Sequence, residues 1–243
     1  MDEDSVLEWK LRAAAIPGAL LVALAFHAWP TGHFLQRTFL SMMVHELGHA
    51  TTAWWCGFGA LPTLWKTLIP EVRGFVAPIA VALFEGFLVF RGWTTQRYVL
   101  VVIGLVLGVV QFTGTSGITN HQAHALITFG GDGGAMVLGT LLMASFFVPR
   151  LRAGGIRWGL VVIGAAAFVD TFATWWSARS DPDVIPFGEI EGVGLSDPSK
   201  LTDVYGWPEA QLVHRYVELG VACLIALGVI WSWGVWRARR VAA

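Results

Sequence analysis

His45 and His49 are four residues apart in His45-Glu46-Leu47-Gly48-His49, inside an apolar run over 34–56. On an α-helix, positions i and i+4 lie on one face, so the two imidazoles can bind one metal ion. Glu46 can then reach a water molecule beside the metal, a division of labour typical of zinc hydrolases. With seven histidines and nine glutamates in 243 residues, chance gives about 0.007 matches per chain, so coincidence is a poor explanation.

The apolar surroundings of this motif also favour a metal ion. Two histidines and a glutamate are costly to bury in a bilayer without partners. A bound cation removes that cost. The alternative is a hydrogen-bonded polar cluster that faces the inside of a helix bundle.

Zinc held by two histidines needs a third protein ligand and leaves a fourth position for water. Asp132 is the leading candidate, since the glycine pairs of Phe129–Gly134 permit an irregular backbone close to a metal. His121 and His124 compete with it, because either could replace Asp132 as ligand, bind substrate or lie at a wet interface. Asn120, the only asparagine of the chain, could hold the substrate backbone or an oxyanion.

The remaining polar residues of interest lie at or within other apolar runs. His27, His33 and His214 are near the ends of runs and are expected at the interface. Asp170 lies inside the sixth run, where it could pair with a neighbouring helix or support a metal ligand from behind.

Composition identifies the elements that must position these residues. Apolar residues make up 55% of the chain and charged residues 14%, against about 25% charged in soluble domains. The charges gather in short gaps between apolar runs, which is the pattern of a multi-pass membrane protein. A net charge of −1 excludes a basic nucleic-acid binder. Two cysteines, Cys56 and Cys223, exclude a disulfide framework and a cysteine-based zinc ribbon.

The expected fold is all-α, a bundle of six to seven transmembrane helices that forms a single domain over 1–243. Seven apolar runs are long enough to be considered as spans: 13–30, 34–56, 75–90, 98–114, 133–149, 158–176 and 214–236. The segment 177–213 is expected to be an extramembrane loop. It carries seven acidic residues, and either simply connects two spans or gates a substrate.

The motif region resembles a known family. Met43–Ala50 looks like the zinc helix of the site-2 protease family of intramembrane metalloproteases. Asp132-Gly133-Gly134 resembles the family's later D-G motif, and Val76–Ala80 loosely resembles its A-G-P segment. The sequence departs from the family in lacking a Pro-rich stretch before Asp132. It also has two candidate spans between the motifs where one is usual, so that one of them would be re-entrant or Asp132 would sit at a helix junction.

The resemblance implies zinc held by His45, His49 and Asp132, with Glu46 as the general base that takes a proton from the attacking water. The implied activity is hydrolysis of a peptide bond in or near a substrate transmembrane helix, as in regulated intramembrane proteolysis. The implied partners are that helix and the lipid bilayer, with no nucleic acid or nucleotide. The expected location is a prokaryotic plasma membrane.

Two other functions remain open. One is a seven-span zinc hydrolase of lipid amides, resembling the alkaline ceramidase and adiponectin-receptor superfamily. Those proteins typically have a histidine pair in the final span, where this chain has only His214 at the start. The other is a non-catalytic membrane scaffold or a transporter. An intact Glu46 argues against a silent scaffold. The sequence also lacks the paired broken helices that are expected of a transporter.

Overall fold

The computed structural model describes residues 3–151, 155–190 and 194–242. The fold is all-α, which confirms the predicted class. Within the described ranges, six helices are long and apolar enough to cross a membrane. They are α1 (Glu3–His27), α4 (Val76–Thr94), α5 (Tyr98–Phe112) with the π-helical turn η2 (Thr113–Gly117) that continues it, α6 (Asn120–Ala144), α7 (Ile156–Ser177) and α9 (Glu209–Ala242).

The run over 34–56 is helical as far as Trp55. α2 (Pro30–Gln36), the π-helical turn η1 (Arg37–Ser41) and α3 (Met42–Trp55) follow one another without a break. This helix is not one of the six named above. π-helical turns are frequent at functional sites, and this one directly precedes the helix that carries the histidine pair.

The Gly-rich segment around Asp132 is helical, so the expected irregular backbone is wrong. α6 begins at Asn120 because Thr119 and Gln122 form a capping box, in which each side chain bonds the other residue's backbone. It runs on through Phe129–Gly134 to Ala144. Asp132 therefore lies in the middle of a long helix, and neither a helix junction nor a re-entrant span is needed to place it.

The short strands and helices lie in the connections between the long helices. A hairpin of β1 (Leu61–Pro62) and β2 (Thr67–Leu68) follows α3. The connection from α7 to α9 contains a second hairpin, β3 (Glu189–Ile190) with β4 (Gly194–Leu195). It ends in the short helix α8 (Asp197–Ser199) and the π-helical turn η7 (Lys200–Val204). The segment expected to be a plain loop thus has local structure.

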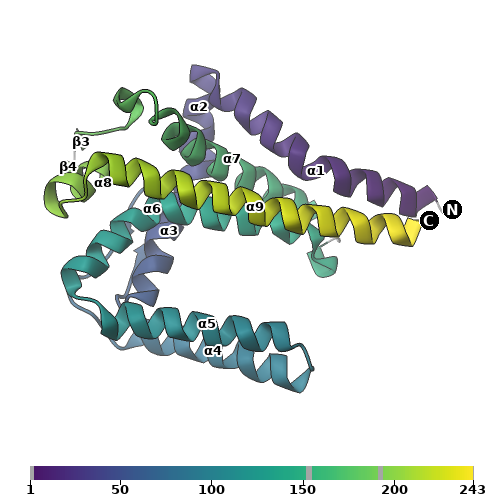
Figure 1. The fold of residues 1–243 in the computed structure, drawn as a ribbon, viewed down its shortest axis with the longest axis horizontal. Coiled ribbons are helices and arrows are strands. Elements are labelled where there is room, and N and C mark those ends of the chain that lie inside the picture. The colour runs from purple at the N-terminus through teal and green to yellow at the C-terminus, as the bar shows by residue number, and fades with distance from the viewer. Residues whose placement is uncertain (1–2, 152–154, 191–193, 243) are drawn as a thin grey trace.

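Figure 1 shows how these elements are arranged. α1 and α9 run side by side, so that the two ends of the chain lie together. α6 and α7 pack beside them, and the main buried cluster, with Met136, Trp175 and Tyr216, draws on these helices. The hairpin of α4 and α5 forms a separate layer that meets the rest of the bundle at the ends of α3 and α6.

α3 and α6 approach until their backbones touch. A Cβ added at Gly48 would lie 2.3 Å from the carbonyl oxygen of Gly130, and one added at Gly134 would lie 2.4 Å from the Cα of Gly48. No side chain fits at these positions without moving a helix. The glycines around Asp132 therefore serve close helix packing, as small residues commonly do in membrane bundles.

Gly48→Ala is expected to destabilise the fold by about 1–3 kcal/mol, since the new methyl group overpacks a backbone contact. The measurement is the thermal midpoint of helicity in detergent, followed by circular dichroism. Gly86→Ala is the matched control, because an added Cβ at Gly86 of α4 meets nothing within 4 Å. Equal midpoints for the two variants would contradict the close α3–α6 contact.

Candidate metal centre

The two histidines of the motif face each other on α3. Their ring centroids are 4.7 Å apart with nearly perpendicular planes, and their Nε2 atoms are 3.1 Å apart. Gly131 makes room for them, because a Cβ there would lie 2.5 Å from Nε2 of His49 and 2.6 Å from Cε1 of His45. The two histidines thus lie on one face of the helix, as predicted, and α6 packs against their rings at Gly131.

On each imidazole, Nδ1 contacts an oxygen atom of α6. Nδ1 of His49 donates to the carbonyl oxygen of Ile127 at 2.7 Å. Nδ1 of His45 lies 2.9 Å from Oδ1 of Asp132. The other oxygen of Asp132 accepts from Nε1 of Trp175 on α7 at 2.7 Å. A carbonyl oxygen only accepts, so His49 must carry its proton on Nδ1, and the carboxylate of Asp132 favours the same tautomer for His45.

Asp197 lies on the side of the histidine pair where both Nε2 atoms point. Its Oδ2 is 3.2 Å from Nε2 of His45 and 2.9 Å from Nε2 of His49. Asp197 is the first residue of α8, where Ser196 accepts a hydrogen bond from the backbone of Ser199 and so caps the helix. Burial acts to raise the pKa of the Asp197 carboxyl, but its contacts with His45 and His49 outweigh burial and hold that pKa well below its usual value.

These three side chains could hold a metal ion. One donor atom from each of His45, His49 and Asp197 lies within 4.8 Å of the others. With the protons on Nδ1, the two Nε2 lone pairs point at each other and at a carboxylate oxygen. That arrangement needs a positive charge among the three atoms, which either a metal ion or a second proton on an imidazole supplies. Two imidazoles and one carboxylate are also a donor set that suits zinc and leaves a fourth position open.

Asp132 is close to this group but in a different place from the one expected of a third ligand. Its two oxygens are engaged by Nδ1 of His45 and Nε1 of Trp175, on the side of the imidazole away from His49 and Asp197. Carboxylates in that position orient a metal-binding histidine and raise its basicity. In this structure Asp132 contacts the outer nitrogen of His45, whereas Asp197 lies beside the Nε2 atoms of both histidines.

Asp197 is the residue that the sequence did not single out. It lies in the acidic segment that was expected to connect two spans, among six other acidic residues. Ser196-Asp197-Pro198 does read as a helix start, with a capping serine and a proline in the first turn. That pattern fixes the local backbone of Asp197, but it gives no sign that α8 folds back onto α3.

Glu46 points toward the β1–β2 hairpin. The hydroxyl of Thr67 lies 2.7 Å from Oε2 of Glu46 and 2.8 Å from its backbone oxygen. The residue is buried, with 6% of its surface exposed. This contact attaches the hairpin to the helix turn that carries the histidines.

The residues predicted to contact substrate lie toward the start of α6. Asn120 and His121 are exposed, and the ring of His121 packs edge-on against Tyr205. His124 is half-buried against Phe58. Asn120 is twelve residues from Asp132, about 18 Å along the helix. The structure does not bring Asn120, His121 or His124 into the group of His45, His49 and Asp197.

Comparison with known proteins assigns no family to the chain. No protein-family model, curated protein or solved structure matches it. The function proposed below therefore depends on the residues of the metal centre and on their surroundings.

Proposed function

We propose that this protein is an intramembrane zinc metalloprotease that hydrolyses a peptide bond in or near a transmembrane helix of its substrate. The observation that carries the proposal is the convergence of the His45 and His49 Nε2 atoms on Asp197. Three electron-pair donors meet there, and a metal ion among them would stabilise the group. A general base candidate, Glu46, stands on the same helix between them.

His45, His49 and Asp197 would hold the metal, with Asp132 behind His45. A zinc ion bound there would supply a Lewis acid that activates water and polarises a carbonyl group. The protein's own contribution is orientation. The bonds of Asp132 and Ile127 to the two Nδ1 atoms fix both rings, so the donor atoms need little rearrangement on binding.

Glu46 would act as the general base. Thr67 engages Oε2 of its carboxylate, which leaves Oε1 to take the proton of an attacking water and pass it to the leaving nitrogen. The partner hydroxyl comes from the β1–β2 hairpin, so a substrate segment lying along this hairpin would come close to the base. Such a segment must be extended, because a helical backbone hides its carbonyl groups in hydrogen bonds.

The centre lies where the middle of α6 meets the end of α7. Asp132 is twelve residues from either end of α6, Asn120–Ala144. It bonds Trp175, which is two residues from the end of α7, and Asp197 belongs to the connection that follows α7. The centre therefore lies toward this end of the bundle. A protein substrate would then be cut in its transmembrane helix or close to the end of it.

Removal of metal is expected to abolish cleavage, and added zinc is expected to restore it. The substrate probe is a synthetic transmembrane peptide of about 20 apolar residues, with a central Gly-Pro pair that weakens the helix and a fluorophore and quencher at its ends. Protein reconstituted in liposomes is stripped with a chelator, and fluorescence is followed before and after zinc is returned.

The matched control is the double variant His45→Ala/His49→Ala, which should gain nothing from added zinc. Cleavage by a preparation verified to be free of metal would contradict the proposal. Hydrolysis of a lipid amide in the same liposomes, with the peptide left intact, would favour the lipid hydrolase instead.

A further inference from the structure

A second group of histidines and a carboxylate lies where α1, α2 and α7 meet. Nε2 of His33 is 2.8 Å from Oδ1 of Asp170, and Nδ1 of His27 is 3.9 Å from the same oxygen. One donor atom from each of the three residues lies within 4.8 Å of the others. None of the three belongs to the metal centre on α3.

The turn between α1 and α2 brings the two imidazoles together. His27 is the last residue of α1. Trp29 then adopts an extended backbone, with φ −106° and ψ 123°, and Pro30 begins α2 in a new direction. His33 follows one turn later, and its ring centroid lies 4.4 Å from that of His27. Two residues that are six apart in the sequence thus present nitrogen atoms to one carboxylate.

The hydrogen bonding of this group is incomplete. Nδ1 of His27 is buried and has no hydrogen-bond partner, and its 3.9 Å distance from Asp170 is too long for a hydrogen bond. Asp170 is 1% exposed, and its second oxygen, Oδ2, lies 3.3 Å from Nη1 of Arg37. Arg37 therefore holds one oxygen of the carboxylate while the other faces both imidazoles. A buried nitrogen without a partner calls for an explanation.

We propose that His27, His33 and Asp170 form a second metal site, for a late first-row divalent ion such as zinc. Donor atoms around a tetrahedral zinc ion are about 3.4 Å apart, and the two distances to Asp170 Oδ1 lie on either side of this value. A bound ion would occupy the lone pair of His27 Nδ1 that nothing else satisfies. Imidazole and carboxylate donors together suit zinc and its neighbours better than calcium or magnesium.

The site can be reached from outside, since the His33 side chain is 37% exposed while that of Asp170 is 2% exposed. A metal bound there would tie the α1–α2 corner to α7, which gives it a structural role. Its affinity should be lower than that of the His45–His49 centre, because the cationic Arg37 lies beside Asp170, whereas the first centre has two carboxylates, Asp132 and Asp197. We therefore expect zinc to fill the first centre before the second.

Equilibrium dialysis of the metal-stripped full chain in detergent against zinc should show two ions per chain at saturation. His27→Ala/His33→Ala should bind one ion and lose the weaker step of the titration. His45→Ala/His49→Ala should also bind one and keep the weaker step. The count does not depend on enzymatic activity, and the two variants separate failure of this site from failure of the proposed protease.

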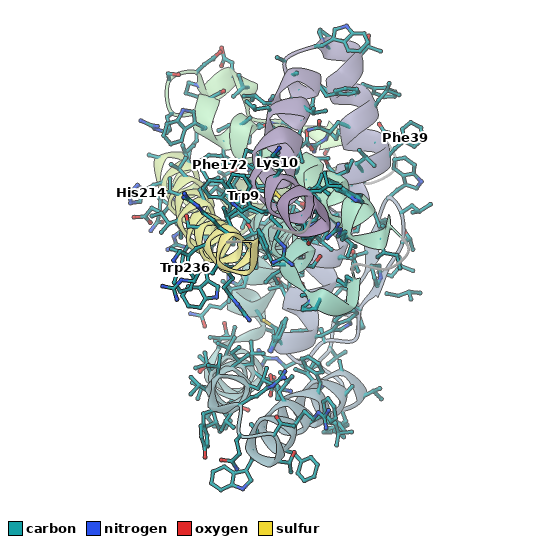
Figure 2. The ribbon with its side chains drawn as sticks, turned by 90° about the vertical axis from the view of Figure 1, so that its right-hand side faces the viewer. Trp9, Lys10, Phe39, Phe172, His214 and Trp236 are labelled. Carbon is teal, nitrogen blue, oxygen red and sulfur yellow. The ribbon has the colours of Figure 1, made fainter. Side chains whose placement is uncertain are left out.

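Asp170→Asn is the conservative variant, since it keeps the shape of the side chain and removes the charge that a divalent ion needs. It should lose the weaker step as well, with helicity checked by circular dichroism. His214→Ala is the matched control. His214 lies on the outer side of α9 (Figure 2), where it pairs with Glu218 and its side chain is 68% exposed. Its loss should leave two ions. An unchanged zinc count in His27→Ala/His33→Ala, or no zinc bound by His45→Ala/His49→Ala, would overturn the proposal.

Discussion

Asp197→Ala is expected to strip the metal from the His45–His49 centre, whereas Asp132→Ala is expected to weaken binding and leave it measurable. Asp197 provides a donor atom next to both Nε2 atoms, so its loss leaves two neutral nitrogens and no carboxylate donor beside them. Asp132 acts from behind His45, and loss of such an outer carboxylate costs about 10- to 100-fold in metal affinity. Zinc affinity of the two variants, measured by competition with a chromogenic chelator, checks the order.

Asp203→Ala is the matched control, since Asp203 is an exposed carboxylate of the same segment and its loss should leave zinc binding unchanged. The opposite order of effects in the two variants would contradict this prediction. If Asp132→Ala loses the metal and Asp197→Ala keeps it, the third ligand is the one that the family resemblance implies, and the acidic segment has no part in the centre.

Glu46→Gln is expected to lower the rate of peptide cleavage by about 10²- to 10⁴-fold, the usual contribution of a general base, while zinc content stays the same. Glutamine has the shape of glutamate and can still accept the bond from Thr67, so the hairpin contact survives. It cannot take a proton at neutral pH. The measurement pairs the initial cleavage rate with the zinc content of the same preparation.

Glu71→Gln serves as the control for Glu46→Gln, because Glu71 is an exposed glutamate in the connection that follows the hairpin. Its cleavage rate should match that of the unaltered protein. Cleavage at an undiminished rate by Glu46→Gln would rule out Glu46 as the base, even if the metal centre itself is correct.

Local patterns in the sequence predicted the class of fold and two of the three side chains of the candidate metal centre. Hydropathy identified the long helices, because a bilayer demands long apolar runs whatever their neighbours are. The spacing of His45 and His49 identified their common face, because both residues belong to one helix. The start of α6 at Asn120 was also readable, since Thr119 and Gln122 form a local capping box. The prediction missed it by relying on hydropathy alone.

The features that the sequence did not reveal depend on contacts between distant segments. Asp197 is one of several acidic residues in a polar connection, and only the return of α8 to α3 distinguishes it. The glycines around Asp132 had two uses consistent with the sequence, an irregular loop or a close helix contact. The choice between them depended on Gly48 lying opposite. The approach of His33 to His27 likewise depends on the direction in which α2 leaves α1, which the sequence does not reveal.

The donors of the metal centre are far apart along the chain, since 148 residues separate His49 from Asp197. A ribosome must therefore translate the connection that follows α7 before the three donors can meet. A nascent chain that has inserted its helices as far as α7 carries both histidines but lacks the last carboxylate. We expect such a chain to capture zinc poorly and to be inert toward the other proteins crowded around the site of insertion. The proposed activity would then begin only after the connection that follows α7 has been made, and until that point the surrounding membrane proteins would be spared.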